Sequence, residues 1–310
     1  MPDMKKWILI GFLLLLAGAA SAQSFEEAKA IFMRQKRAES PFEGHYTLNE
    51  SMADNYMLND SLEVDRCRLE VVYSAGIVLD TIAGFRCNDV VVVQVGDSLQ
   101  KFYSTIRWRR NMNHTLFQLR RDDEQVACPS SVYQVAVDYE VYRDLKRRKF
   151  INRHSLYATK NQLFEYEEPL PAFGWSIRPD TTTILGYICQ RAEAEHAGRR
   201  WRVWFTPEIP VDGGLWKFNG LPGLILKAED DRDHFRFTAT EIRQPQRCIV
   251  HYRARTKRMS RKAYRELEAR TFHNPFPTES YGIGITNPST GKMEFLPLDW
   301  QMPYNPIELK

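Results

Sequence analysis

Histidine and cysteine are residues with which many enzymes move protons or hold metals, and this chain spaces them in no familiar catalytic pattern. No two histidines stand two or four residues apart, the spacing of a local metal-binding pair. The chain has no G-x-S-x-G turn, phosphate-binding loop, H-E-x-x-H or C-x-x-C. We therefore predict no catalytic residues, no metal site and no cofactor. The histidines are His45, His114, His154, His196, His234, His251 and His273.

Acidic residues gather at Glu165–Glu168 and Glu229–Asp233. A glycosidase needs two carboxyl groups that face each other across a cleft. The second cluster lacks the glycine and the terminal glutamate of a calcium loop. Adjacent acids at a hairpin tip more often solvate a turn, which is the interpretation we favour.

Basic residues form a more unusual pattern between Arg243 and Arg265, where nine Lys or Arg occur without an acid. One interpretation is a solvated face, or arginines stacked on aromatic rings. Another is a patch for anionic lipid or glycolipid head groups. The net charge of +4 is too small to indicate a nucleic-acid protein by itself, and we predict no nucleic-acid partner. The candidate anion patch is Arg253, Arg255, Lys257, Arg258, Arg261 and Lys262.

The first 22 of the 310 residues read as a secretory signal peptide. Lys5 and Lys6 precede an apolar run, Trp7–Ala20, that ends in Ala20-Ser21-Ala22. The run is shorter than the roughly 20 residues that span a bilayer. No later stretch is long and apolar enough for a membrane helix. We expect an exported protein, periplasmic, outer-membrane-associated or secreted, with one domain over residues 23–310 and a loop-rich tail over 271–310.

All five cysteines follow the signal peptide, so export would bring them into an oxidising compartment. Two bridges among five cysteines allow 15 arrangements, among which the sequence cannot choose. Our guess pairs Cys67 with Cys87 and Cys189 with Cys248, and leaves Cys128.

The elements that would position these residues are mostly strands. Short β-branched runs recur from Cys67 to about Ile242 without helical patterns between them, which indicates an antiparallel sheet. A short helix is predicted at each end, over Phe25–Arg37 and Ser260–Arg270, and a loop over Asn274–Gly291. The predicted fold is mainly β, a curved antiparallel sheet or half-barrel of about 8–12 strands. The strand segments are Leu69–Val72, Ile77–Leu79, Val90–Val95, Lys101–Ser104, Gln134–Tyr142, Leu163–Tyr166, Ile184–Ala192, Trp201–Thr206, Leu224–Ala228 and Phe235–Ile242.

The densest motif lies between Gly186 and Asp230. It contains Gly-Tyr-Ile-Cys from Gly186, Trp-Phe-Thr-Pro-Glu from Trp204, and the hexapeptide Gly220-Leu221-Pro222-Gly223-Leu224-Ile225. In these residues, and in Tyr304–Leu309 at the end of the chain, the sequence closely resembles the GLPGLI family of exported Gram-negative envelope proteins. The resemblance spans most of the mature chain. It implies kinship and compartment, while the role of that family is not established.

None of the six motif side chains can transfer a proton or bind a metal. The proline fixes one φ near −65° and the glycines can take positive φ, so the motif predicts a stiff corner docked on Trp201, Trp204 and Trp216. An alternative is the lip of an apolar groove lined by these tryptophans and Tyr187.

Three functions remain open from the sequence. The first is a non-enzymatic protein that binds an apolar or lipid-like ligand on a concave β face, as exported carriers with half-barrel folds do. The second is an accessory interaction module of an outer-membrane or surface protein, docking through residues 243–265 and 274–291. The third is an exported hydrolase, which would need His154 or His234 to meet an acid and a serine or cysteine in space.

Overall fold

The computed structural model describes residues 60–81, 84–108, 111, 136–156, 162–254, 256–273, 284–286, 293–295 and 304–310. The described chain is mainly strand, with helix α4 (Arg261–His273) near its end. The strands are β1 (Ser61–Arg66), β2 (Leu69–Asp80), β3 (Phe85–Val95), β4 (Leu99–Ser104), β5 (Tyr139–Asp144), β6 (Lys149–Ser155), β7 (Leu163–Pro169), β8 (Ser176–Ile184), β9 (Tyr187–His196), β10 (Arg199–Thr206), β11 (Leu224–Asp230), β12 (Phe235–Arg243), β13 (Cys248–Tyr252), β14 (Thr256–Arg258), β15 (Gly284–Thr286) and β16 (Met293–Phe295).

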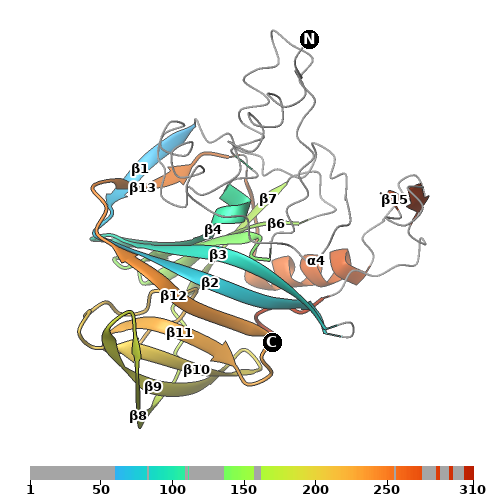
Figure 1. Ribbon diagram of the computed structural model, residues 1–310. Helices are drawn as coiled ribbons and strands as arrows, with labels where there is room; N and C mark the ends of the chain where they lie inside the picture. Colours follow the sequence, from blue (N-terminus) through green and yellow to red (C-terminus); the bar gives the residue numbers. More distant parts are fainter. Residues whose placement is uncertain are drawn as a thin grey trace, which may run out of the picture.

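One open sheet holds twelve of these strands, in the order β14-β7-β6-β5-β4-β3-β2-β12-β11-β10-β9-β8. Strands β2–β7 form one antiparallel meander and β8–β12 another, and the antiparallel pairing of β2 with β12 joins them. The short β14 runs parallel to β7. In Figure 1, β2, β3 and β12 run side by side and β8–β11 curl away from them. The predicted curved, mainly antiparallel sheet is confirmed.

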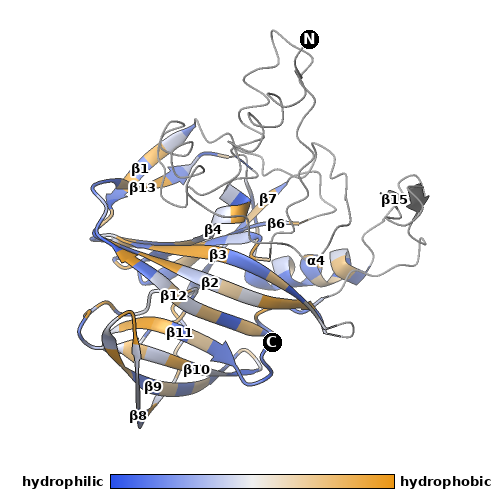
Figure 2. Ribbon diagram, in the orientation of Figure 1, coloured by the Kyte–Doolittle hydropathy of each residue, from blue (hydrophilic) through white to orange (hydrophobic). Residues whose placement is uncertain are grey.

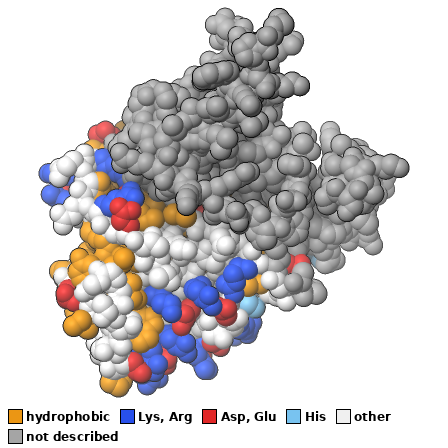
Figure 3. Space-filling view, in the orientation of Figure 1, with side chains coloured by type: hydrophobic (Ala, Val, Ile, Leu, Met, Phe, Trp, Pro, Cys, Tyr) orange, Lys and Arg blue, Asp and Glu red, His pale blue; other side chains and the backbone are white. Residues whose placement is uncertain are grey.

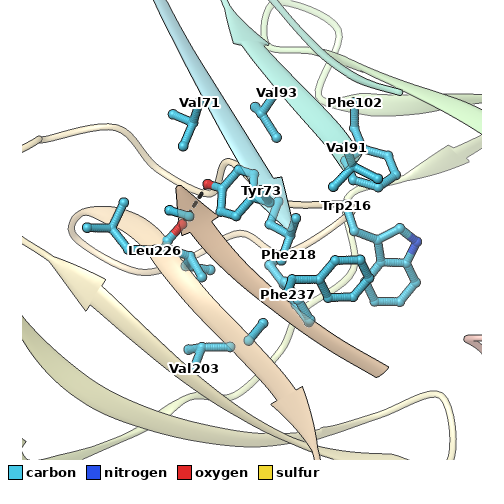
Figure 4. Close-up of a cluster of buried hydrophobic side chains, with 14 of the residues drawn as sticks. Val71, Tyr73, Val91, Val93, Phe102, Val203, Trp216, Phe218, Leu226 and Phe237 are labelled. Carbon is cyan, nitrogen blue, oxygen red and sulfur yellow. Dashed lines mark hydrogen bonds between the residues drawn. The ribbon is translucent and has the colours of Figure 1, made fainter. Parts of the chain in front are cut away.

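The curvature brings one face of distant strands together. Side chains from β2, β3, β4, β10, β11 and β12 converge in a single buried cluster on the concave face (Figure 4). Leu215, Trp216 and Phe218, from the connection between β10 and β11, fill the space between them. The Tyr73 hydroxyl donates to the Ile225 carbonyl at 2.7 Å. Each large apolar side chain buried in this way contributes roughly 1.5–3 kcal/mol.

The convex face of β2–β7 is also covered. Val72, Val92, Tyr103, Trp108 and Leu163 pack there with Tyr252 of β13. Strands β13 and β1 pair into a separate two-stranded sheet that lies at one end of β2 and β3 in Figure 1. Because both faces of β3 are covered, its valines need not alternate with polar residues, and they form an unbroken apolar stretch in Figure 2.

Several predicted boundaries are wrong. The segment Ile184–Ala192, predicted as one strand, contains the turn at Leu185 and Gly186 that separates β8 from β9. The residues Ser74-Ala75-Gly76 suggested a break between two short strands, whereas β2 is continuous. Ala75 packs in the concave core, and Ser74 and Gly76 continue the ladder opposite Val90 and Asn88. The predicted loop over 274–291 contains strand β15, which pairs with β16.

The predicted C-terminal helix is confirmed as α4 and runs three residues further than expected, to His273. Ser260 caps it, with its hydroxyl accepting from the Ala263 N–H at 3.2 Å. The signal peptide, the predicted helix over Phe25–Arg37, Cys128 and Arg255 lie outside the described residues. Within the described ranges, no helix is long and apolar enough to cross a membrane.

The guessed disulfides are absent. Cys67 precedes β2 opposite the end of β3, whereas Cys87 pairs with Ile77, about 27 Å further along the same hairpin. Cys189 lies in the large sheet and Cys248 in the two-stranded one. A disulfide needs Cα atoms within about 7 Å. Each thiol instead donates a hydrogen bond, to the carbonyl of Leu69, Asn88 or Tyr187, or to the Glu63 carboxylate.

Candidate functional site

The hexapeptide Gly220–Ile225 forms the corner that leads into β11. Gly220 has φ +88°, a conformation that side-chain-bearing residues rarely adopt. Leu221, Leu224 and Ile225 are buried in the concave core, and Pro222 is exposed. Asp212 fixes the corner from outside, because its carboxylate accepts from the Gly220 N–H at 2.6 Å and pairs with Arg143 at 2.6 Å.

Gly223 has a different role from Gly220. A Cβ atom at Gly223 would lie 2.1 Å from the Thr206 carbonyl oxygen, so the second glycine permits close approach to the end of β10. Trp201 and Trp216 are fully enclosed, with ring centroids 5.8 Å apart. Trp204 and Tyr187 are half-buried and pack at the edge of the same core. The motif is therefore a structural corner, and Trp201 and Trp216 are core residues that cannot line an open groove here.

The candidate anion patch is weaker than the sequence indicates. Acids distant in sequence approach it, so that Arg253 pairs with Asp60 at 3.6 Å and Arg258 with Glu165 at 3.1 Å. Arg261 contacts two further acids, described next. Of the remaining described members, Lys257 and Lys262 are exposed. A stretch without acids in sequence is thus largely neutralised in space.

Four buried or half-buried charged residues form a closed ring, which we call the charge square: Glu168, Lys217, Arg261 and Glu308. The Lys217 ammonium lies 2.6 Å from Glu168 and 2.7 Å from Glu308. The Arg261 guanidinium lies 3.2 Å and 2.8 Å from the same two carboxylates. The ring ties together β7, the β10–β11 connection, α4 and the C-terminal segment 304–310. Burial alone would raise the pKa of Glu308, but Lys217 and Arg261 lower it to about 2.

Beside the charge square, on the concave side of β5–β7, lies an aromatic group that we call the His154 cluster: Tyr139, Asn152, His154, Tyr166 and Tyr264. Strand pairing sets Tyr139 opposite His154 and Asn152 opposite Tyr166. The His154 ring lies 5.2 Å from Tyr139, 5.5 Å from Tyr166 and 4.4 Å from Tyr264 of α4. The histidine is thus enclosed by three tyrosine rings.

Three polar atoms of this cluster are buried without a hydrogen-bond partner among the described residues: the Tyr139 hydroxyl, Nε2 of His154 and Oδ1 of Asn152. The Asn152 orientation is fixed, since its Nδ2 donates to Glu168 at 2.9 Å. Each such atom costs about 1–3 kcal/mol when left unsatisfied. Three of them within one cluster mark a place where a ligand would gain hydrogen bonds.

The electrostatics of the cluster favour neutral side chains. Burial lowers the pKa of His154 well below its usual value, and the nearby cations Lys217 and Arg107 lower it further. Burial likewise raises the pKa of Tyr139 well above the usual range. At neutral pH the site therefore offers an uncharged imidazole, a protonated phenol and an amide oxygen.

Sequence reasoning reached only part of this site. The hydrolase hypothesis requires His154 or His234 to meet an acid and a serine or cysteine, but His154 has neither a serine nor a cysteine within hydrogen-bond distance in the described chain. His234 lies on the β11–β12 hairpin instead, 3.4 Å from the Arg199 guanidinium. The alternation Val137, Tyr139, Val141 correctly placed Tyr139 on the core face. Nothing in the sequence pointed to Asn152 or Lys217, and Glu308 stood out only as a member of the terminal motif Tyr304–Leu309.

Neither a protein-family model nor a curated protein matches this chain. Among solved structures, PNGF-II is similar in two crystal forms, with TM-scores of 0.46 and 0.45 at 11% identity. The matched region covers 67% of this chain and 34% of PNGF-II, so the chain spans about a third of the length of that protein. A likeness this distant supports no conclusion about function, and the GLPGLI resemblance stays a prediction.

Proposed function

We propose that this protein is an exported envelope protein, related to the GLPGLI family, that binds a small hydroxyl-bearing ligand with a flat apolar body at the His154 cluster. The observation that carries the proposal is the set of three buried, unpartnered polar atoms within a tyrosine-walled cluster. The sequence predicts an apolar ligand on the concave face. The proposal adds that this ligand carries a hydroxyl group and binds at the His154 cluster.

The chemistry of the three atoms restricts the ligand. The Asn152 oxygen only accepts hydrogen bonds, so the ligand must bring a donor such as a hydroxyl. The Tyr139 hydroxyl can donate in return. The surrounding rings favour a flat apolar body, which stacks on aromatic faces. A charged ligand is disfavoured because the cluster is buried and the adjoining charges already neutralise one another in the charge square.

The test compares 2-naphthol with 2-methylnaphthalene, which has the same shape but no donor. We expect calorimetry to show that the full mature protein prefers 2-naphthol about tenfold, the equivalent of about 1.4 kcal/mol for a hydrogen bond in a buried site. Tyr139→Phe and His154→Phe should each reduce the preference. His196→Phe is the matched control, because the His196 ring also packs against a buried ring outside the cluster, with its centroid 4.2 Å from that of Phe173.

Equal binding of both probes, or an unchanged preference in Tyr139→Phe and His154→Phe, would contradict the proposal. Thermal unfolding of each variant shows whether a lost preference reflects a lost fold.

A second candidate, docking of another envelope protein, is favoured by the hairpin of β8 and β9. Strand β8 is an edge of the large sheet, and Ile177, Leu185 and Ile188 are 48%, 44% and 64% exposed. Figure 3 shows hydrophobic side chains gathered on this side, next to mixed charges over β10 and β11. A photo-crosslinker at position 188 in intact cells should yield one discrete adduct, and the same probe at Arg200 none. Identical patterns would count against docking here.

A further inference from the structure

A second polar cluster lies on the convex face of the sheet, away from the His154 cluster, and is centred on Lys101. This residue of β4 is 3% exposed and pairs across the sheet with Gln94 and Tyr142. Its ammonium donates to the Val250 carbonyl at 2.9 Å. Rings of Tyr103, Tyr142 and Tyr252 surround it at 4.9, 5.4 and 5.0 Å from their centroids. We call these three rings the tyrosine cage.

Lys217 provides an internal comparison, since it is also 3% exposed. Lys217 contacts two carboxylates within 2.7 Å, whereas Lys101 forms no ion pair with any described residue. Within the described part of the chain, two lysines are thus buried equally, and carboxylates are in contact with only one of them. The cage rings attract a cation, but they accept hydrogen bonds much more weakly than carboxylates do.

The wider surroundings of Lys101 are mixed in charge. Burial is the main influence and lowers its pKa to about 8; Glu140 raises it, and Arg153, Arg107 and Arg247 lower it further. The other ionisable groups that face it include the three cage tyrosines and His251. The Tyr142 hydroxyl donates to Glu140 at 3.0 Å, and the His251 ring lies 5.3 Å from the Tyr142 ring. The fraction of uncharged Lys101 amine at pH 7 is therefore much larger than for an ordinary lysine.

We propose that Lys101 is a covalent binding site for small aldehydes and ketones, which it takes up as an imine inside the tyrosine cage. The uncharged amine nitrogen attacks the carbonyl carbon, and the resulting carbinolamine loses its oxygen as water together with both amine protons. No oxidant or reductant is needed. Burial and Glu140 raise the pKa of Tyr142 well above its usual range, so the phenol keeps its proton. Beside the amine, its hydroxyl can turn from Glu140 and donate a hydrogen bond to the oxygen of the carbonyl or carbinolamine.

The carbonyl class follows from the burial of the site. A buried ammonium without a carboxylate is costly, and an uncharged imine removes that cost, so the product suits the cage better than the free cation does. The aromatic walls accommodate an apolar substituent, while an anionic carbonyl compound would bring a second charge into the buried site. Val250 and Tyr252 both belong to β13, so the two-stranded sheet forms one wall of the cage.

The test is a time course of labelling of the full mature protein with propionaldehyde and sodium cyanoborohydride at pH 7, which reduces any imine to a stable amine. Peptide mass mapping should show Lys101 labelled at least tenfold faster than the exposed Lys257 and Lys262, with Lys217 unlabelled. Lys101→Met should abolish the early label and leave the slow ones. Tyr142→Phe should slow labelling at position 101 without affecting Lys257.

Labelling of Lys101 no faster than that of Lys217 would overturn the proposal. This comparison uses only the wild-type protein, so it tests the proposal even if Lys101→Met fails to fold. The site is independent of the His154 cluster, and loss of 2-naphthol binding would leave this labelling unchanged.

Discussion

At the scale of single residues, the hexapeptide shows how one motif uses two glycines for two reasons. Gly220 supplies a left-handed backbone with φ +88°, and a Cβ there would make only an ordinary contact, 3.8 Å from Trp175. Gly223 is needed because it has no side chain: its Cα lies so close to the backbone of Thr206 that a Cβ atom would not fit. The exposed Pro222 between them stiffens the chain without taking part in the core.

We expect Gly223→Ala to be the most damaging single-atom change in the motif. The new Cβ would meet the backbone at 2.1 Å, which forces β10 and β11 apart and should lower the free energy of unfolding by several kcal/mol. Gly220→Ala should lower it by about 1–2 kcal/mol through backbone strain alone. Pro222→Ala is the matched control, with an effect under about 1 kcal/mol. Denaturant unfolding measures all three, and equal losses at the two glycines would contradict the distinction.

At the scale of elements, the C-terminal segment 304–310 acts as a strap across the sheet and helix α4. The Arg199 guanidinium donates to Ile307, Asn305 and Pro306, and the Leu309 N–H donates to the Ala197 carbonyl at 2.7 Å. Glu308 completes the charge square. Removing the strap would leave the buried side chains of Arg199 and Lys217 with fewer hydrogen-bond acceptors. Because the two cations would stay buried, this loss should lower the free energy of unfolding more than removing both partners of an ion pair would.

The strap also predicts a pH dependence that can be isolated in one variant. The pKa of Glu308 is about 2 in the folded state and near 4.5 when unfolded, so its stabilisation is complete above pH 4.5 and is lost as pH falls towards 2. Glu308→Gln should therefore lower the free energy of unfolding by about 3 kcal/mol at pH 7. The difference from wild type should shrink between pH 5 and pH 3. Glu266→Gln, an exposed position on α4, is the control, and a constant difference across this range would contradict the assignment.

At the scale of the whole molecule, the sequence predicts most strands with an apolar face and misses others, among them β6 and β13. Hairpins β9–β10 and β11–β12 alternate clearly and are confirmed. Strand β6 was missed because Lys149-Phe150-Ile151-Asn152-Arg153-His154-Ser155 looks like a polar loop. Its Arg153 lies between Glu140 and Glu165 of the neighbouring strands, so the charges are buried as partners from distant segments. The periodicity of a single sequence cannot reveal ion pairs between distant segments. For the same reason the candidate site could not be predicted, since β6 carries both Asn152 and His154.

The contact of β2 with β12 has a further consequence, for the order in which the chain can fold. Ala75 pairs with Phe237, so more than 150 residues separate the two partners at the middle of the sheet. Until the second partner is available, the first meander ends in a long, apolar, unpaired edge, the kind of surface on which newly made chains aggregate. Pairing of strands so distant in sequence is slow, because the chain loses the conformational entropy of a large loop before the new contacts stabilise it. Pairing of β2 with β12 is therefore also the folding step before which the first meander exposes this apolar edge.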